Sequence, residues 1–129
     1  MGKAKVVCDT DAVACSWSTD SSCTTLVYNG ASLAAPDELY SLDLRTGSTK
    51  QITHLNRPYI ISRRYNIAEE IEFNNGRQKL MGWLVKPPKF NSKKKYPFIL
   101  NIHGGPRGQY GRTFYHEMYV LAQAGYVVM

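Results

Sequence analysis

The stretch LNIHGGPRGQYG, residues 100–111, decides how the rest of the chain is interpreted. An apolar run at residues 98–102 stops there at a histidine, which two glycines and a proline follow. Such a turn leaves backbone N–H groups open to a ligand, because glycine has no Cβ to block the approach. Three interpretations are open at this point: a plain turn, a phosphate-binding loop, or a donor site for an oxyanion.

The phosphate interpretation fits the spacing poorly. A dinucleotide fingerprint needs GxGxxG between a strand and a helix, and GGPRGQYG does not supply it. A P-loop ends in Gly-Lys-Ser/Thr, whereas Arg112 and Thr113 follow Gly111. The plain turn stays open, since Gly-Gly-Pro alone is a weak signal. The oxyanion interpretation needs rigid N–H donors at the end of a strand, and α/β-hydrolases place an HGGG-like loop after their third strand.

The residues before this stretch predict three strands. Residues 71–73 and 80–85 form a hairpin pattern around Asn75-Gly76, a strong hairpin signal, and Pro87-Pro88 ends the second strand. Residues 96–103 are a continuous apolar stretch, as expected for a strand buried on both faces. The glycine turn therefore follows the third strand of its segment, which agrees with the oxyanion interpretation.

The residues after the turn predict a helix and another strand. Within residues 112–125, the positions Phe114, Met118, Leu121 and Ala122 recur at helical spacing, and Gly125 suits the C′ position. Residues 126–129 begin a further buried strand. The order strand, glycine turn, helix and strand predicts a βαβ unit with parallel strands.

The N-terminal half predicts antiparallel β-structure. Its short β-branched and aromatic runs are residues 12–17, 24–30, 38–44 and 49–55. Turn signals separate them at residues 18–22, 35–37 and 45–48. A four-stranded sheet of this kind is marginal alone and looks like one blade of a β-propeller. Residues 56–69 lack a sustained period and predict a linker, in which Pro58 restricts Arg57 to extended backbone.

Four segments of the sequence resemble a known family of enzymes. The segments GWLVKPPKF, KKYPFILNIHGGPRGQYG and FYHEMYVLAQAGYVVM resemble the prolyl oligopeptidase family of serine peptidases, in its acylaminoacyl-peptidase-like branch. The segment DELYSLDLRTGSTKQITHLN resembles the last propeller strands before the hydrolase domain of that family. The resemblance implies one or more β-propeller blades followed by the incomplete N-terminal part of an α/β-hydrolase domain. The implied boundaries are 1–56 for the propeller part, 57–69 for the linker and 70–129 for the truncated peptidase domain.

The resemblance also implies site residues. The backbone N–H of Gly105 would be an oxyanion-hole donor, and His103, Gly104 and Pro106 would support the loop. His103 stands where related branches carry a tyrosine whose hydroxyl assists the oxyanion, so we expect this histidine to orient the loop. The implied reaction is hydrolysis of short peptides or acyl-amino peptides through an acyl-enzyme, without a metal or another cofactor.

The nucleophile of such an enzyme is missing from the sequence. A serine hydrolase of this fold needs a GxSxG elbow and then an Asp and a His, and no GxSxG occurs in residues 1–129. Ser62, Asp43, His54 and His116 do not stand where a triad would need them. We therefore expect a fragment that is inactive alone. Two alternatives stay open: a non-catalytic interaction module, and an esterase or lipase of the same hydrolase fold, against which the blade-like N-terminal half argues.

Charge and hydropathy indicate which classes of binding partner to expect. The net charge of +6 is concentrated in residues 62–65 and 89–97, which are typical of solvated loops. Because these basic residues are local runs and do not form a basic face with aromatic residues spaced across it, we expect no nucleic-acid binding. No apolar run approaches the roughly 18 residues of a membrane span, so we expect no membrane partner.

The cysteines and the N-terminal residues indicate where in the cell to expect the protein. Cys8, Cys15 and Cys23 match no CxxC or zinc spacing, so we expect buried or half-buried thiols in a reducing, cytoplasmic setting. The N-terminus lacks the apolar core and cleavage site of a secretory signal. Val6 stands where a myristoylation signal needs Ser or Thr.

Overall fold

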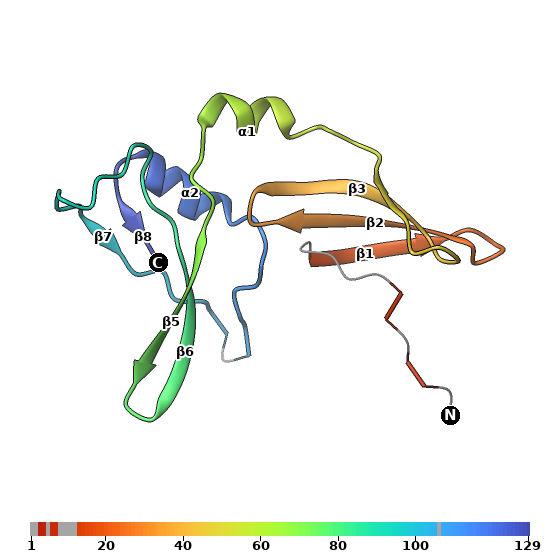
Figure 1. The fold of residues 1–129 in the computed structure, drawn as a ribbon, viewed down its shortest axis with the longest axis horizontal. Coiled ribbons are helices and arrows are strands. Elements are labelled where there is room, and N and C mark those ends of the chain that lie inside the picture. Colours follow the sequence, from red (N-terminus) through yellow and green to blue (C-terminus); the bar gives the residue numbers. More distant parts are fainter. Residues whose placement is uncertain (1–2, 5, 8–12, 106) are drawn as a thin grey trace. The chain divides into compact units, whose positions relative to one another are not determined.

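The computed structural model describes residues 3–4, 6–7, 13–105 and 107–129 (Figure 1). Its contacts divide the chain into two units. The first unit contains Met1–Pro58 and Arg112–Phe114, and the second contains Tyr59–Gly111 and Tyr115–Met129. The main division falls close to the end of the stretch 1–56, whose assignment to a propeller stays a prediction.

The first unit is an antiparallel sheet in the order β1-β2-β3-β4. Its strands are β1 (Val13–Thr19), β2 (Thr25–Ser32), β3 (Ala35–Asp43) and β4 (Thr49–Gln51). The four predicted strands and the hairpin between the last two are confirmed. Tyr28 pairs with Tyr40 across β2 and β3, and their rings stack 5.4 Å apart. Paired residues share one face of the sheet, and on this face Tyr28 and Leu42 are buried.

The predicted turn at residues 35–37 is wrong. Residues 33–34 make the turn instead, and Ala35 already pairs with Ser32. Pro36 lies near the start of β3, where the register shifts between Gly30 and Ser32. A proline has no N–H to donate to a ladder, so it is tolerated at the start of a strand or beside such an irregularity.

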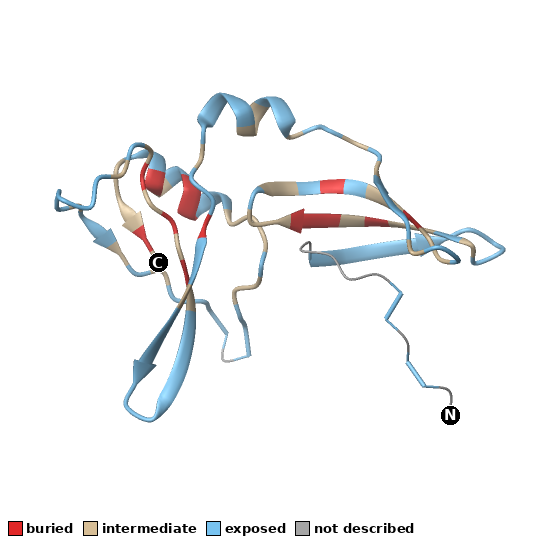
Figure 2. Ribbon diagram, in the orientation of Figure 1, coloured by how far each residue is buried: buried red, intermediate tan, exposed pale blue. Residues whose placement is uncertain are grey.

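β1 is exposed along its whole length (Figure 2). Cys15 in this strand and Cys23 in the turn after it are exposed free thiols, so the expectation of buried cysteines is wrong for both. Among the described strands β1 pairs only with β2, so it is an edge strand, and all of its residues are exposed. Cys8 lies outside the described residues.

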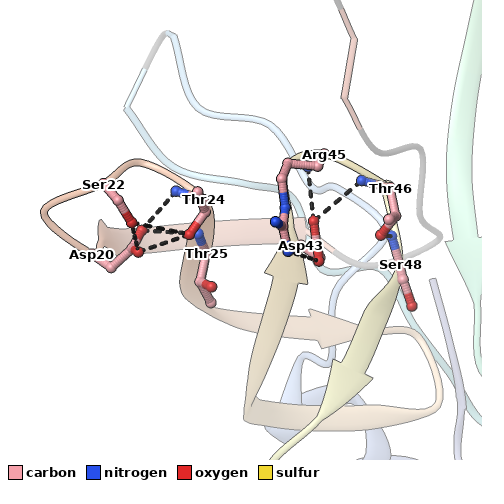
Figure 3. A network of polar contacts seen from close by, with 8 residues as sticks. All are labelled: Asp20, Ser22, Thr24, Thr25, Asp43, Arg45, Thr46 and Ser48. Atoms are coloured by element: carbon pink, nitrogen blue, oxygen red, sulfur yellow. Dashed lines mark hydrogen bonds and ion pairs between the residues drawn. The ribbon is translucent and has the colours of Figure 1, made fainter.

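Asp20 organises the turn between β1 and β2 (Figure 3). Its carboxylate accepts hydrogen bonds from the hydroxyl of Ser22 and from the backbone N–H groups of Thr24, at 2.8 Å, and Thr25, at 2.9 Å. The Ser22 hydroxyl and these N–H groups favour the charged carboxylate, and they hold the pKa of Asp20 well below its ordinary value.

Asp43 plays the same part in the turn between β3 and β4 (Figure 3). It accepts from the backbone N–H groups of Arg45, at 2.8 Å, and Thr46, at 3.2 Å. The Arg45 guanidinium lies 3.3 Å from the same carboxylate, and its hydrogen bond lowers the pKa of Asp43. Both turns therefore use an aspartate side chain in place of a backbone acceptor.

Glu38 ties the segment after β4 to β3. Its carboxylate is buried and accepts from the Thr53 hydroxyl at 2.5 Å and from the backbone N–H groups of Asn56, at 2.7 Å, and Leu55, at 3.1 Å. Burial alone raises the pKa of this carboxyl, but the hydrogen bonds outweigh burial and leave the pKa below its ordinary value. The charged form is therefore the one that the fold holds.

The short helix α1 (Arg57–Arg63) contains the point in the chain where the first unit ends, at Pro58, and the second begins, at Tyr59. The sequence predicts no regular structure in residues 56–69, whereas residues 57–63 are helical. The extended backbone expected at Arg57 is therefore wrong. Pro58 does not prevent the helix, because the first turn of a helix has N–H groups without intrahelical acceptors. Whether residues 57–69 join two domains stays a prediction.

The hairpin of β5 (Glu69–Asn75) and β6 (Gln78–Leu84) is confirmed. Asn75 pairs with Gln78, so the two turn residues are Gly76 and Arg77, one position later than predicted. Gly76 has φ +61° at the first central position, as a type II′ turn requires.

The predicted βαβ unit is confirmed. β7 (Phe98–Ile99) runs parallel to β8 (Val127–Val128), with α2 (His116–Gln123) between them in the chain. Val85, just after β6, bridges to Val128 on the other side of β8, and both valines are fully buried. The expectation of a long strand buried on both faces is wrong, since β7 is short and Phe98, Leu100 and Ile102 are exposed.

Gly125 ends α2 as predicted. It has φ +100°, its N–H donates to the Ala122 carbonyl, and the Tyr126 N–H donates to the Leu121 carbonyl. This pair of bonds is a Schellman motif, which returns the chain towards β8. Met118 and Ala122 are buried as the helical spacing predicted, together with Tyr119. No helix in the described ranges is long and apolar enough to cross a membrane.

Candidate functional site

The candidate site is the loop of residues 100–111, which follows β7, the third strand of the second unit. Gly105 has φ +59°, a left-handed conformation that L-residues adopt at a cost. A Cβ at this glycine would meet nothing within 4 Å. The position therefore favours glycine for its backbone conformation, and it leaves room beside the backbone for a substrate atom.

Gly105 is exposed, and its N–H is the group expected from the sequence to be a donor. No acceptor for it lies among residues 3–4, 6–7, 13–105 and 107–129, while the Gly105 carbonyl accepts from the Gly108 N–H at 2.8 Å. An N–H group held at a strand end with no internal acceptor is what an oxyanion hole requires. The role of Gly105 as such a donor stays a prediction.

Gly108 lies against the peptide that carries this N–H. A Cβ on Gly108 would be 2.4 Å from the Gly104 carbonyl oxygen, closer than real Cβ atoms come. The Gly104 carbonyl and the Gly105 N–H belong to one planar peptide and point in opposite directions. The close approach of Gly108 on the carbonyl side therefore constrains where the N–H points.

Tyr110 connects the end of the loop to its beginning. Its hydroxyl donates to the Asn101 side-chain oxygen at 3.0 Å, and its carbonyl accepts from the Trp83 indole N–H of β6 at 3.2 Å. Its ring meets the rings of Tyr115, 4.6 Å away, and His103, 6.0 Å away, both edge to face. Tyr115 also accepts the backbone N–H of Gly111 at 2.9 Å.

His103 is exposed, so the premise of a buried imidazole is wrong. Its Nδ1 lies 3.5 Å from the Gly104 carbonyl oxygen, at the limit of hydrogen bonding, and its ring contact is with Tyr110. These contacts come from the loop itself, and the orienting role of His103 stays a prediction, as does the supporting role of Gly104. Pro106 lies outside the described residues.

Three of the other residues considered for catalysis, Ser62, His116 and Asp43, have structural partners. The hydroxyl of Ser62 donates to the Tyr59 carbonyl within α1, at 2.8 Å. His116 begins α2 and is exposed, with its Nε2 2.8 Å from the Tyr59 hydroxyl. That hydroxyl also lies 2.6 Å from the Tyr65 hydroxyl, and burial together with this contact raises the pKa of Tyr65 to about 12. Asp43 belongs to the turn described above.

A metal centre finds no support in the described part of the chain. None of its His, Cys, Asp and Glu side chains gather in groups of three or more that could hold an ion.

Sequence reasoning missed four residues of this site: Trp83, Asn101, Gly108 and Tyr110. Asn101, Gly108 and Tyr110 stand inside the quoted stretch, but no spacing rule predicts a contact between Tyr110 and Asn101. The one available signal was an amphipathic tyrosine at the end of a glycine-rich loop, since a half-buried tyrosine usually finds a partner for its hydroxyl.

Curated relatives of the chain are peptidases. The chain is 41% identical over 95 residues to the uncharacterized peptidase YuxL of Bacillus subtilis, a match that covers 73% of this chain and 14% of the relative. It is 33% identical over 110 residues to dipeptidyl-peptidase 5 of Porphyromonas endodontalis, covering 82% of this chain and 16% of the relative. The chain thus spans less than a fifth of the relatives that it matches. No family model matches it.

Solved structures similar to this chain are also peptidases. The acylaminoacyl peptidase of Pyrococcus horikoshii has a TM-score of 0.79 and 28% identity, over 93% of this chain and 19% of that structure. An acylaminoacyl peptidase in complex with Z-Gly-Gly-Phe-chloromethyl ketone has the same TM-score and identity, over 93% of this chain and 18% of that structure.

Proposed function

We propose that this chain forms part of a serine-type peptidase. The premise is that its homologues are peptidases and that its structural neighbours are acylaminoacyl peptidases of the prolyl oligopeptidase family. In this proposal the first unit is a blade of a β-propeller and the second is the beginning of an α/β-hydrolase domain. The four-stranded antiparallel sheet and the βαβ arrangement after the hairpin support these two assignments.

One observation supports the site assignment above the others. Gly105 follows the third strand of the second unit in a left-handed conformation, and its N–H meets no acceptor among the residues that the structure describes. In the proposal this N–H donates to the carbonyl oxygen of the scissile bond as negative charge develops on it. Removing one such donor typically lowers the rate about 10²- to 10³-fold.

The proposed substrates are short peptides or acyl-amino peptides, cleaved through an acyl-enzyme. A relative named as a dipeptidyl-peptidase and a structural neighbour holding a peptidyl chloromethyl ketone support a peptide substrate. The proposal includes action in the cytoplasm and no requirement for a metal or another cofactor.

The chain supplies the oxyanion donor but not the nucleophile. Residues 1–129 contain no GxSxG elbow, so the proposal places the catalytic serine, aspartate and histidine in sequence beyond this chain. An oxyanion donor without a nucleophile offers no covalent route to hydrolysis. The chain alone is therefore expected to be inactive.

A fluorophosphonate probe tests this proposal. We expect no labelling of the isolated chain and stoichiometric labelling of a single serine in the longer protein that carries it. The extended protein should also release product from acyl-peptides faster than from short esters. Labelling of a serine within residues 1–129, or an extended protein that takes no probe, would contradict the proposal.

A further inference from the structure

We propose that Tyr110 is a positioning residue for the Gly104–Gly105 peptide, acting through the side chain of Asn101 and the indole of Trp83. The proposal rests on the proposed function, since it assigns Tyr110 to the oxyanion loop of that peptidase. Tyr110 itself need not touch the substrate.

The two ends of the loop are connected by a hydrogen bond between side chains. Asn101 directly follows the β7 ladder, where its own N–H donates to the Met129 carbonyl at 2.7 Å. The Tyr110 hydroxyl donates to the side chain of the same asparagine at 3.0 Å. A side chain at the far end of the loop is thereby fixed to the segment from which the loop departs, which restricts the conformations open to the described residues between them.

A second attachment fixes the backbone of Tyr110. Its carbonyl accepts the Trp83 indole N–H at 3.2 Å, and Trp83 is only 5% exposed. The indole is therefore held by the packing of β6, and a donor held in this way can fix the carbonyl that it meets. Tyr110 is thus attached to β6 through its main-chain carbonyl and to Asn101, which follows the β7 ladder, through its hydroxyl.

Tyr110 can influence the Gly104–Gly105 peptide through two neighbouring residues, His103 and Gly108. The Tyr110 ring meets the His103 ring edge to face, next to Gly104. Gly108, two residues before Tyr110, donates its N–H to the Gly105 carbonyl and lies against the Gly104 carbonyl. Both carbonyls that flank the Gly105 N–H are therefore in contact with the segment that Tyr110 holds.

A misplaced donor reduces catalysis through the transition state. An oxyanion forms only as the reaction proceeds, so a poorly aimed N–H lowers kcat and kcat/KM together and leaves KM nearly unchanged. A displacement of about 1 Å can cost about 100-fold in rate. The geometry thus predicts a kinetic signature that a general loss of stability would not produce.

The test uses Tyr110→Phe in the longer peptidase that contains this chain, with Tyr96→Phe as the matched control. Tyr96 also uses its hydroxyl to bind a loop, since it accepts the Asn91 N–H at 2.9 Å, but that loop lies before β7. We expect kcat of Tyr110→Phe to fall about 10- to 100-fold with KM within twofold of wild type. Tyr96→Phe should keep both constants. Asn101→Ala should reproduce the loss, and the double variant should add little to it.

Hydrogen–deuterium exchange of the peptide covering residues 100–111 gives a readout that does not depend on turnover. We expect faster exchange in Tyr110→Phe and in Asn101→Ala, and wild-type exchange in Tyr96→Phe. Unchanged exchange in Tyr110→Phe, or unchanged kcat, would overturn the positioning role. A wild-type protein that takes no fluorophosphonate would instead defeat the proposed function, and the exchange comparison would still decide whether Tyr110 holds the loop.

Discussion

Gly108 lies so close to Gly104 that a Cβ added to Gly108 would be 2.4 Å from the Gly104 carbonyl oxygen. The same Gly108 donates its N–H to the Gly105 carbonyl at 2.8 Å. This close approach fixes the peptide whose other side carries the Gly105 N–H. The relationship makes Gly104, Gly105 and Gly108 unequal, and substitution can separate their contributions.

Alanine at each of these glycines should give three different results. Gly108→Ala forces the Gly104 carbonyl to move and should lower the free energy of unfolding by about 1–3 kcal/mol. Gly105→Ala meets no atom but keeps φ +59°, which should cost about 1–2 kcal/mol. Gly104→Ala has open space and no positive φ, so a change within about 0.5 kcal/mol is expected. Urea unfolding measures all three, and equal costs at the three positions would refute the steric account.

Glu38 should make the first unit sensitive to acid. Its pKa lies below the ordinary value of 4.5 in the folded protein, so the stability that it contributes is present above pH 4.5. That contribution is lost as the pH falls through the lower, folded pKa. Glu38→Gln should cost about 1–3 kcal/mol at neutral pH, because its three partners are all donors and an amide offers a single acceptor oxygen.

The measurement is the difference in unfolding free energy between wild type and Glu38→Gln as a function of pH. We expect this difference to shrink as the pH drops below 4.5. Glu72→Gln serves as the control, because Glu72 carries its exposed carboxylate in a surface ion pair with Lys79. A difference that does not change from pH 7 to pH 3 would show that the carboxylate charge of Glu38 is not what holds residues 53–56.

The Tyr59 hydroxyl should hold α1 in the second unit. It lies within hydrogen-bond distance of both Tyr65 and His116, so Tyr59→Phe removes two contacts at once. We expect a loss of about 1–3 kcal/mol in stability and earlier proteolysis within residues 57–65. Tyr126→Phe is the control, because its hydroxyl meets no hydrogen-bond partner in the described part of the chain. Equal stability of the two variants would show that the Tyr59 hydroxyl contributes nothing.

The helices, strands and turns that were predicted correctly from the sequence are determined by residues close together in the chain. The β5–β6 hairpin follows from a glycine turn between alternating residues, and the end of α2 follows from Gly125 with its positive φ. The four strands of the first unit follow from β-branched and aromatic runs between polar turns. In each case neighbouring residues determine the structure, so a reading along the chain can find it.

The elements that the sequence predicted poorly depend on distant residues. The exposure of Cys15 depends on what covers β1, and the exposure of Phe98 depends on what covers β7; neither follows from the local pattern. Pro58 enters the first turn of α1, where a helix tolerates it, although its position suggested a break. In the candidate site, the HGGP motif was visible, whereas the link from Tyr110 to Asn101 needs the folded loop.

The central claim is that the Gly105 N–H donates to the oxyanion, and a crystal structure of a covalent adduct tests it most directly. The longer protein carrying this chain would be inactivated with a peptidyl phosphonate and its structure determined. The account predicts that the Gly105 nitrogen lies about 2.7–3.1 Å from the phosphonyl oxygen that represents the oxyanion. An adduct whose oxygen is bound by other donors, with the Gly105 nitrogen beyond hydrogen-bond distance, would contradict the account.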